Sequence, residues 1–550
     1  MKKFQKFCAF ALASLMMLTA CSGKSEQGEA PTNPKDDMSQ KPSIERLANK
    51  EEFIFACKVF DGNFDPCTGW GQYGTPLMQS KLMNINSTSL EKDLATDYKV
   101  SEDGLTWTFT IRDDVKFHDG EKLTAKDVAF TYNNTKEIGG KVDLTTMDKA
   151  VAIDDTTVEF KMNTPFSSFL YNTAALGIVP EHAYGDSASY SKNPIGSGPL
   201  KFVQYDEGQQ LIMERNDDYY GEKSNFKKVV MLMMNADAAF AAVKAGNVDL
   251  AITNQALAQS AVDGYSVKEF ETYDYRVISF PDTKPGGKTE QGDPMGNAVT
   301  SDVAIRKALS IGIDRNNMVE NVLNGYGEPT FDVFSKFPWG LGEEVKSLKD
   351  NDKEAAKKIL EEAGWKLNSE GIREKDGVKA EFDLMYGITA LDRQAIALSF
   401  AEEAKELGII VTPKGLDWSE IEKNAKTQPM VLGGGQYNPM NISRLFSSKY
   451  ANQTGWANVV GYNNPKTDEY MQKAIESIDE KAANEYWKKS LWDGEFGPSA
   501  MGDNVYIPVC YLEHLFFVRD GVSLGADIVL PHDHGPGVMG DVVHWDYNEK

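Results

Sequence analysis

Apolar and polar residues alternate in short runs over the first half of the chain. One run, LTWTFTIRDDVKF, places Trp107, Phe109 and Ile111 on one face and threonines on the other, which is the period of a half-buried strand. The run TTVEFKM alternates in the same way, and PLKFVQYDEGQQLIMER predicts a hairpin that turns at residues 206–208. We therefore expect short strands separated by turns from about residue 51 to about residue 300.

Helical patterns follow from about residue 301. In DRNNMVENVLNG an apolar stripe lies between Asp314, an N-cap candidate, and Gly325, a C-terminal stop. The run DKEAAKKILEEAGW repeats this scheme between Asp352 and Gly364. A third helix is expected over about residues 391–407, before the strand-like IIV. This alternation predicts an α/β sheet in the second half.

The N-terminus has the pattern of an export signal. Three lysines precede an apolar run from Cys8 to Leu18, which is too short to span a bilayer as a stable helix. The run ends in LTAC, which resembles the lipobox of bacterial lipoproteins, in which the signal is cut before the cysteine and the thiol is acylated. We expect a lipoprotein signal peptide over residues 1–20, lipidation of Cys21 and a flexible polar tether over residues 21–50.

The composition of the chain is that of a globular protein. The chain has 550 residues, of which 41% are apolar and 11% aromatic, enough for two or three domains. No later stretch reaches the roughly 18 uninterrupted apolar residues of a membrane-spanning helix. The formal net charge of −24 repels nucleic acid phosphates, so no nucleic-acid partner is expected.

Three cysteines remain beyond Cys21, so at most one disulfide forms. A bond between Cys57 and Cys67 and simple burial of all three, including Cys510, are both open at this point.

Several segments resemble the peptide/nickel group, family 5, of the extracytoplasmic solute-binding proteins of ABC importers. They occur in the order of that family: DLATDYKVSEDGLTWTFTIRDDVKFHDGEKLTAKDVAFTY, NPIGSGPLKFVQYDEGQQLIMERNDDYY, AAVKAGNVDLAI, SDVAIRKALSIGIDRNNMVENVLNGYGEP, AAKKILEEAGW and GYNNPKTDEYM. The resemblance covers most of residues 51–518.

The resemblance implies a two-lobed, type II periplasmic-binding-protein-like α/β fold that encloses its ligand between the lobes. The first lobe should carry an extra subdomain over about residues 86–194, and two strands should cross between the lobes near Val277 to Phe280 and near Val505 to Pro508. The implied domains are 51–280 plus 506–550 for lobe I and 281–505 for lobe II. Closure around ligand would be hinge motion.

Binding of this kind needs no catalytic group and no cofactor. The sequence has no G-x-S-x-G, H-E-x-x-H or G-x-x-x-x-G-K-[ST] motif, which argues against an exported hydrolase as the alternative. The run GWGQYG fits G-x-G-x-x-G, but Asp65-Pro66 precedes it where a nucleotide-binding turn needs a strand.

The resemblance also supplies candidate cleft residues. Trp70 and Tyr73 follow the first strand and are candidates to stack on ligand, with core packing as the alternative. Peptide-binding relatives carry a motif like A-D-Y-P-D-P whose first aspartate pairs with the peptide ammonium. Here GGGQYNPMN brings Gln436, Tyr437 and Asn441 to that place, and an amide cannot neutralise an ammonium.

A carboxylate-rich ligand such as a nickel or other metal chelate is therefore the competing hypothesis. Arg444 is a candidate for a bidentate contact with a ligand carboxylate, or else a surface arginine paired with an acid. The run PHDHGPG adds His532 and His534 as candidate metal or metal-chelate contacts, with His544 or Asp533 as a further ligand; the alternative is a structural loop.

The sequence predicts a monomeric receptor, lipid-anchored on the outer side of the cell membrane, that captures short peptides or peptide-like solutes for an ABC permease. A lipoprotein that binds solute but feeds no transporter is a further alternative.

Overall fold

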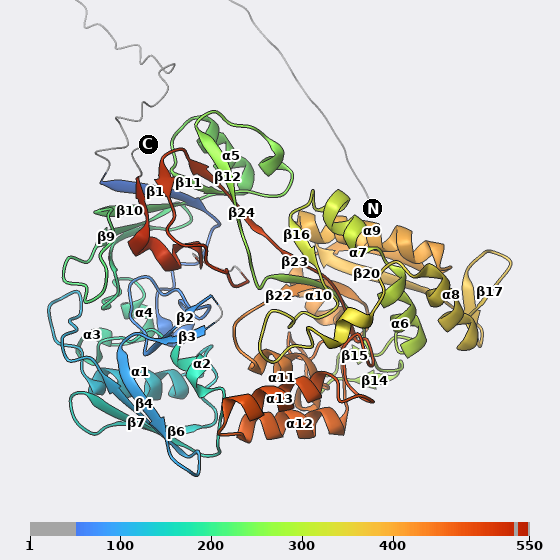
Figure 1. The fold of residues 1–550 in the computed structure, drawn as a ribbon, viewed down its shortest axis with the longest axis horizontal. Helices are drawn as coiled ribbons and strands as arrows, with labels where there is room; N and C mark the ends of the chain where they lie inside the picture. Colours follow the sequence, from blue (N-terminus) through green and yellow to red (C-terminus); the bar gives the residue numbers. More distant parts are fainter. Residues whose placement is uncertain (1–50, 88, 533–536, 548–550) are drawn as a thin grey trace, which may run out of the picture. The chain divides into compact units, whose positions relative to one another are not determined.

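Two large β-sheets organise the protein (Figure 1). The computed structural model describes residues 51–87, 89–532 and 537–547. Within these residues the first sheet has seven strands, in the order β12 (Tyr265–Phe270), β24 (His514–Arg519), β11 (Leu250–Ile252), β1 (Glu52–Cys57), β10 (Lys228–Met233), β9 (Gln210–Arg215) and β8 (Leu200–Asp206). The second has six, in the order β16 (Gly327–Pro329), β23 (Tyr506–Leu512), β13 (Tyr275–Ser279), β22 (Met430–Gly434), β20 (Glu381–Gly387) and β21 (Ile410–Leu416).

A smaller antiparallel sheet forms a subdomain in the first half of the chain. Its strands run β4 (Ala95–Val100), β5 (Thr106–Ile111), β7 (Thr157–Met162) and β6 (Met147–Ala152), and helix α1 (Ala125–Glu137) packs against β6 and β7. Strand β5 buries Trp107, Phe109 and Ile111 on one face, as its alternation predicts. The hairpin β8–β9 is also confirmed.

Helices cover both faces of the six-stranded sheet, so this half is a three-layer α/β structure. Strand β13 shows why: Ile278 belongs to one buried apolar cluster and Val277 to another. The first cluster includes α6 (Val303–Gly312), α8 (Lys353–Glu362) and α9 (Leu391–Glu406). The second includes α11 (Met440–Phe446), α12 (Pro465–Glu476) and α13 (Glu480–Leu491).

Two of the three predicted helices are regular and one is not. Asp352 caps α8 and residues 391–406 form α9, as expected. The predicted helix between Asp314 and Gly325 is present, but it is not a regular α-helix. Asp314 does accept a hydrogen bond from the Asn317 backbone N–H, but α7 (Arg315–Asn317) passes at once into a five-residue π-helical turn, Met318–Val322. Capping residues mark where a helix begins and ends, but they do not indicate that its hydrogen bonds change from the α to the π pattern.

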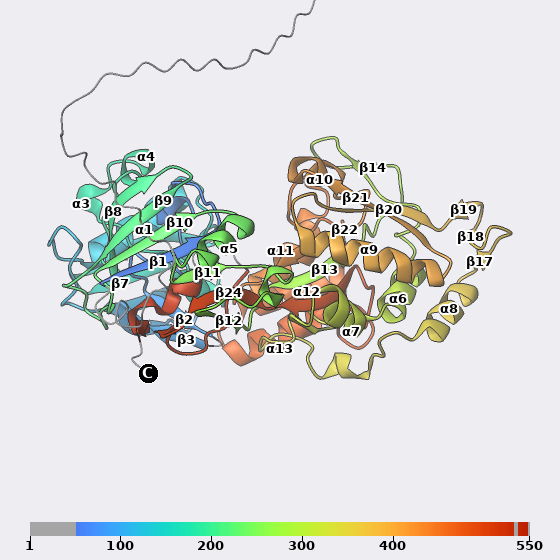
Figure 2. The ribbon, with the colours of Figure 1, turned by 90° about the horizontal axis from the view of Figure 1, so that it is seen from above.

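Two chain segments lead from the first sheet to the second. Figures 1 and 2 show β12 and β24 running towards β13 and β23, so the chain passes between the sheets over residues 271–274 and at Glu513. The expected crossings at Val277 to Phe280 and Val505 to Pro508 instead coincide largely with strands inside the second sheet. Residues 271–274 and Glu513 form the hinge segments named below.

The cysteines of the body are buried. Cys67 and Cys510 are thiols, so no disulfide joins Cys57 to Cys67, and burial of all three is the alternative that the structure supports. Burial raises the pKa of the Cys67 and Cys510 thiols to about 12.

Candidate functional site

Two adjoining cavities lie between the loop after β1 and the C-terminal segment. The first has a volume of about 420 Å³ and is lined by Trp70, Tyr73 and His532, three of the predicted site residues. The second has a volume of about 340 Å³ and is lined by Tyr73 and Tyr437. Because Tyr73 lies in both walls, the structure brings these four predicted residues together.

The loop after β1 holds Tyr73 between the cavities. Trp70 is 9% exposed, its Nε1 donates to the Pro76 carbonyl oxygen at 2.8 Å, and its ring packs edge-on against Phe64. Gly71 takes a φ of 72°, and a Cβ there would lie 2.5 Å from the Pro76 Cα. Trp70 therefore packs in the core and fixes the loop, whereas Tyr73 is half-buried in the cavity wall.

The segment after β22 follows a strained glycine. Gly435 has a φ of 138°, and a Cβ there would lie 1.8 Å from the carbonyl oxygen of Tyr273 in the first hinge segment. The Gly435 carbonyl oxygen accepts a hydrogen bond of 2.8 Å from the His532 backbone N–H. This bond places His532 beside Gln436, although 96 residues of sequence separate them.

The other predicted residues of this segment have different surroundings. Tyr437 is buried among Tyr171, Tyr273 and Trp339, with ring centroids 5.2 to 5.9 Å away. Asn441 Nδ2 donates to the Gln436 carbonyl oxygen at 3.3 Å.

Arg444 is exposed on α11. Burial raises the pKa of Tyr275 and Tyr506, and the positive charge of Arg444 opposes that rise in both. Gln436, Asn441 and Arg444 do not line either cavity.

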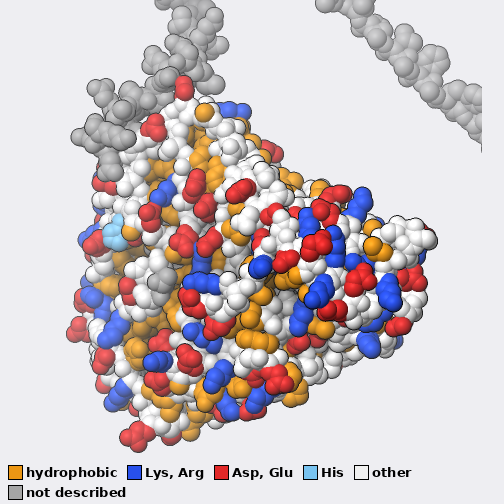
Figure 3. Space-filling view, turned by 45° about the vertical axis from the view of Figure 1, so that its right-hand side comes forward, with side chains coloured by type: hydrophobic (Ala, Val, Ile, Leu, Met, Phe, Trp, Pro, Cys, Tyr) orange, Lys and Arg blue, Asp and Glu red, His pale blue; other side chains and the backbone are white. Residues whose placement is uncertain are grey.

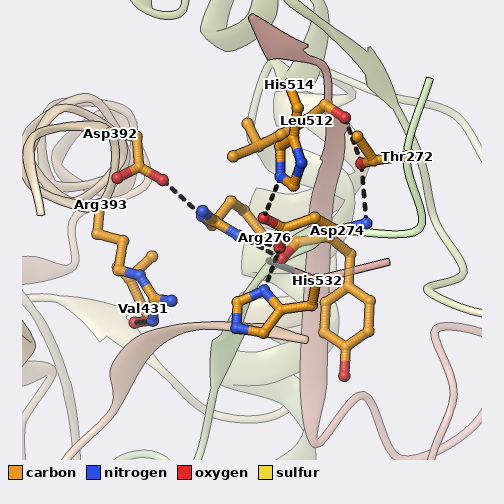
Figure 4. Close-up of polar contacts among 10 residues, drawn as sticks. Thr272, Asp274, Arg276, Asp392, Arg393, Val431, Leu512, His514 and His532 are labelled. Atoms are coloured by element: carbon orange, nitrogen blue, oxygen red, sulfur yellow. Dashed lines mark hydrogen bonds and ion pairs between the residues drawn. The ribbon is translucent and has the colours of Figure 1, made fainter. Parts of the chain in front are cut away.

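Asp274 in the first hinge segment joins four parts of the chain (Figure 4). Its Oδ1 accepts from Arg276 Nη1 at 2.5 Å and pairs with His532 Nδ1 at 2.7 Å, and its Oδ2 pairs with His514 Nε2 at 3.0 Å. Arg276 Nε in turn contacts Asp392 Oδ2, on α9, at 2.5 Å. The network thus ties both hinge regions and the C-terminal segment to the second sheet.

Neighbouring charged side chains keep the buried carboxyl of Asp274 ionised. Burial alone would raise the pKa of this carboxyl, but the charges of Arg276 and His532 and the hydrogen bonds from both histidines outweigh it and hold the pKa well below its usual range. Asp274 is therefore an acceptor only, and the ring nitrogens that face it carry protons.

Arg393 is a buried cation that sequence reasoning missed. It lies in the first turns of α9, is 9% exposed, and donates from Nη1 to the Val431 carbonyl oxygen at 3.2 Å. Its guanidinium lies 4.8 Å from the centroid of the Trp418 ring. Burial, and after it the neighbouring charge of Arg276, lower the pKa of Arg393 to about 10. The only sequence signal is its place in the first turn of the helix that follows strand β20.

Comparison with known proteins supplies the family. A family model described as bacterial extracellular solute-binding proteins, family 5 Middle, matches residues 89–458. The chain belongs to this family. Protein XP55 of Streptomyces lividans is 30% identical over 532 residues, which cover 93% of this chain and 90% of that protein. The oligopeptide-binding protein AppA of Bacillus subtilis is 30% identical over 415 residues, 72% of this chain and 74% of that protein.

Solved structures support the predicted family 5 fold. The crystal structure of NikZ from Campylobacter jejuni in complex with Ni(L-His) superimposes with a TM-score of 0.76 at 24% identity, and covers 90% of this chain and 99% of that chain. The type II periplasmic-binding-protein-like α/β fold is therefore confirmed.

Family 5 membership gives the general role. Its members are extracytoplasmic receptors that bind solutes for ABC importers, so the predicted receptor role is confirmed and the chain is not an enzyme. In the part of the chain that the structure describes, no helix has the length and apolarity to cross a membrane.

The candidate metal contacts of the C-terminus lie only partly within the described residues. His534, Asp533 and Cys21 lie outside the described residues. His544 Nε2 contacts Glu222 at 2.9 Å and its Nδ1 contacts Asp541, so this ring is engaged elsewhere. Within residues 51–87, 89–532 and 537–547 no three histidine, cysteine, aspartate or glutamate side chains are grouped to hold a metal ion.

Charged side chains of both signs cover one face of the molecule (Figure 3). Acidic and basic side chains are interspersed over the face drawn in Figure 3. The net charge of −24 is thus not gathered there into a patch of one sign, and no basic stripe that would bind nucleic acid is seen on that face.

Proposed function

We propose that the chain is a lipid-anchored receptor that captures short peptides or peptide-like solutes between its two sheets and delivers them to a membrane-embedded ABC permease. The ligand would contact Tyr73, Gln436 and Tyr437, with Trp70 supporting the wall from behind. Lobe boundaries near the hinge segments and a monomeric state are part of this proposal.

Arg393 is the observation that carries the ligand assignment. In open α/β sheets, ligands bind outside the carboxyl ends of the strands. Strands β20, β21 and β22 run parallel in this sheet, and Arg393 follows the carboxyl end of β20 on α9. A buried guanidinium with one neutral acceptor among the described residues has donors left for a carboxylate.

The start of α9 adds to this preference for an anion. Residue Ala390 caps the helix without a side-chain hydrogen bond, so the first backbone N–H groups of a 16-residue helix point outwards with a favourable dipole. A peptide carboxylate at this place would meet both these groups and Arg393.

Removing this charge should weaken binding of a free carboxylate. Trialanine and its carboxamide are titrated into the detergent-solubilised full chain and into R393Q. We expect R393Q to bind trialanine about tenfold to hundredfold more weakly, since a charge-assisted hydrogen bond contributes about 1.5 to 3 kcal/mol. The carboxamide should bind both proteins equally.

The variant R444Q is titrated in the same way for comparison with R393Q. If R444Q loses trialanine affinity and R393Q does not, the carboxylate contact belongs to Arg444. If both variants bind trialanine as tightly as the wild type does, neither arginine contacts the carboxylate.

Lipid anchoring at Cys21 is tested separately. Replacing Cys21 by alanine removes the thiol that would be acylated, and a protein without acyl chains has no stable membrane anchor. We expect the wild type to partition into the detergent phase of a Triton X-114 extract and C21A into the aqueous phase. Aqueous partition of the wild type would contradict the anchor.

A second candidate ligand is a nickel or other metal chelate. The observation that favours it is the contact between His532 Nδ1 and Asp274, because metal-binding histidines commonly donate their second ring nitrogen to a carboxylate. His532, together with His534, would then contact the metal. A nickel adduct seen by native mass spectrometry of the wild type and lost in His532→Ala would support this candidate.

A further inference from the structure

The subdomain contacts the helices of the second sheet at a place remote from the hinge segments. Ser167 lies two residues before α2 (Phe169–Thr173), and its backbone N–H donates to the Ile475 carbonyl oxygen at 2.8 Å. Its Oγ donates to the Ala474 carbonyl oxygen, also at 2.8 Å. Figure 1 shows α2 beside α13 and well away from β12 and β24, which lead into the hinge segments. These bonds therefore join the two lobes away from the hinge.

The acceptors of these two bonds lie at the end of a helix. Ala474 and Ile475 belong to the last turn of α12, where carbonyl oxygens lack the intrahelical donors of the helix interior. The negative end of the helix dipole therefore faces Ser167. A donor from the subdomain stabilises this end, whereas an anion at the same place would be repelled.

Tyr171 adds a third bond and a ring contact. Its hydroxyl donates to Glu480 Oε1, at the start of α13, at 3.3 Å. Burial, and after it the negative charge of Glu480, raise the pKa of Tyr171, so the phenol keeps the proton that it donates. The Tyr171 ring centroid lies 5.9 Å from that of Tyr437, which lines the second cavity. The subdomain thus also supports a residue of the cavity wall.

Apolar side chains complete the contact. Ile475 and Met440 are half-buried, and both pack against the apolar cluster of the subdomain as well as against the cluster that includes α11, α12 and α13. Moving the lobes apart would expose this apolar surface to water and break the bonds of Ser167 and Tyr171. The contact therefore favours the closed arrangement of the lobes.

We propose that Ser167, Tyr171 and the corner between α12 and α13 form an interlobe latch, which holds the receptor closed and positions Tyr437 against ligand. The inference rests on the proposed receptor and adds the contact that stabilises its closed state. Ser167 and Tyr171 do not line either cavity, so they are positioning residues.

A latch has an effect on affinity that differs from that of a ligand contact. The apparent dissociation constant of every ligand rises by the same factor when the closed fraction of the protein falls. The loss of a direct contact weakens only those ligands that make the contact. Trialanine and its carboxamide, which differ at the carboxyl end, distinguish the two cases.

The experiment measures the separation of the lobes and the affinity in the full chain in detergent. Spin labels on Asp97→Cys in β4 and Glu485→Cys in α13 report the separation by double electron–electron resonance. Both side chains are exposed, whereas the cysteines of the body are buried. Ser167→Asp places a carboxylate against the carbonyl oxygens of α12. The double variant Ser167→Ala/Tyr171→Phe removes two of the bonds without adding a charge.

Ser168→Ala is the matched control. The Ser168 Oγ is buried and has no hydrogen-bond partner among the described residues, so this change leaves the bonds between the lobes intact. Thermal unfolding of each variant shows that it is folded.

We expect one short distance in the wild type and in Ser168→Ala without ligand. Ser167→Asp should show mainly a longer distance, and the double variant a mixture of the two. Saturating trialanine should restore the short distance in both. By titration calorimetry, trialanine and its carboxamide should each bind Ser167→Asp about tenfold more weakly than they bind the wild type.

Two results would overturn the latch. One is a distance distribution in Ser167→Asp and in the double variant that equals that of the wild type. The other is a loss of affinity for trialanine that the carboxamide does not share, since Ser167 would then act on the ligand itself. If no trialanine derivative binds the wild type, the proposed peptide receptor falls, and the distances alone support or overturn the latch.

Discussion

Replacing Asp274 with alanine is expected to lower the free energy of unfolding by about 3 to 5 kcal/mol. The change removes the carboxylate that Arg276, His514 and His532 share, and a buried cation left without its partner is costly. The network joins both hinge segments to the second sheet, so its loss should also separate the unfolding of the two halves. Urea unfolding followed by tryptophan fluorescence measures both effects.

Acid should reproduce part of this loss in the wild type. The pKa of Asp274 is depressed in the folded protein, so its stabilisation is fully present above the ordinary aspartate pKa of about 3.9 and is lost as the pH falls from there through the folded value. In Asp274→Asn the fall in stability over this range should be shallower.

Glu271 is the matched control for Asp274. It lies in the same hinge segment, but its side chain is 61% exposed and pairs with Lys336 at 2.8 Å. An exposed ion pair contributes at most about 1 kcal/mol, so Glu271→Ala should change stability little. A loss in Asp274→Ala no greater than that in Glu271→Ala would contradict the role of the buried network.

A single methyl group at Gly435 should disrupt the same region from the other side. Its φ of 138° is strained for any other residue, and a Cβ would lie 1.8 Å from the Tyr273 carbonyl oxygen and 2.4 Å from its carbonyl carbon. Both atoms are backbone of the hinge segment, so relief requires the hinge to move. We expect Gly435→Ala to lower the free energy of unfolding by about 2 to 5 kcal/mol.

A substitution at Gly74 distinguishes the cost of backbone strain from the cost of a steric clash. Its φ is 105°, but nothing lies within 4 Å of a Cβ built there. Gly74→Ala should therefore cost only the backbone strain, about 1 to 2 kcal/mol. Calorimetry measures the free energy of unfolding of both variants. Equal decreases in the two would show that the Tyr273 backbone does not clash with a side chain at Gly435.

Local patterns predicted the elements that have one buried face. Strand β5 alternates because only one side packs, and α8 has a side-chain cap and an apolar stripe. Strands β13 and β23 are buried along their whole length, so their residues do not alternate between a buried and an exposed face. For that reason the sequence did not indicate which sheet they join, and the crossings were expected several residues away from the hinge segments.

The site was predictable only in part for a related reason. Tyr73 was a candidate because the resemblance places the segment after the first strand in the cleft, and His532 because it belongs to a dense group of histidines; both line the first cavity. Asp274 pairs with His532 across 258 residues, and no local pattern encodes a contact of that range. Arg393 lies in a helix among buried apolar residues, where its charge becomes informative only once its neighbours are known.

Native mass spectrometry of the full chain, released from detergent after purification without chelators or a histidine tag, shows whether the bound ligand is a peptide. We expect a series of adduct masses that resolve into short peptides on denaturation, and we expect this series to be weaker in R393Q. A single adduct with a nickel isotope pattern that is unchanged in R393Q would contradict the peptide receptor.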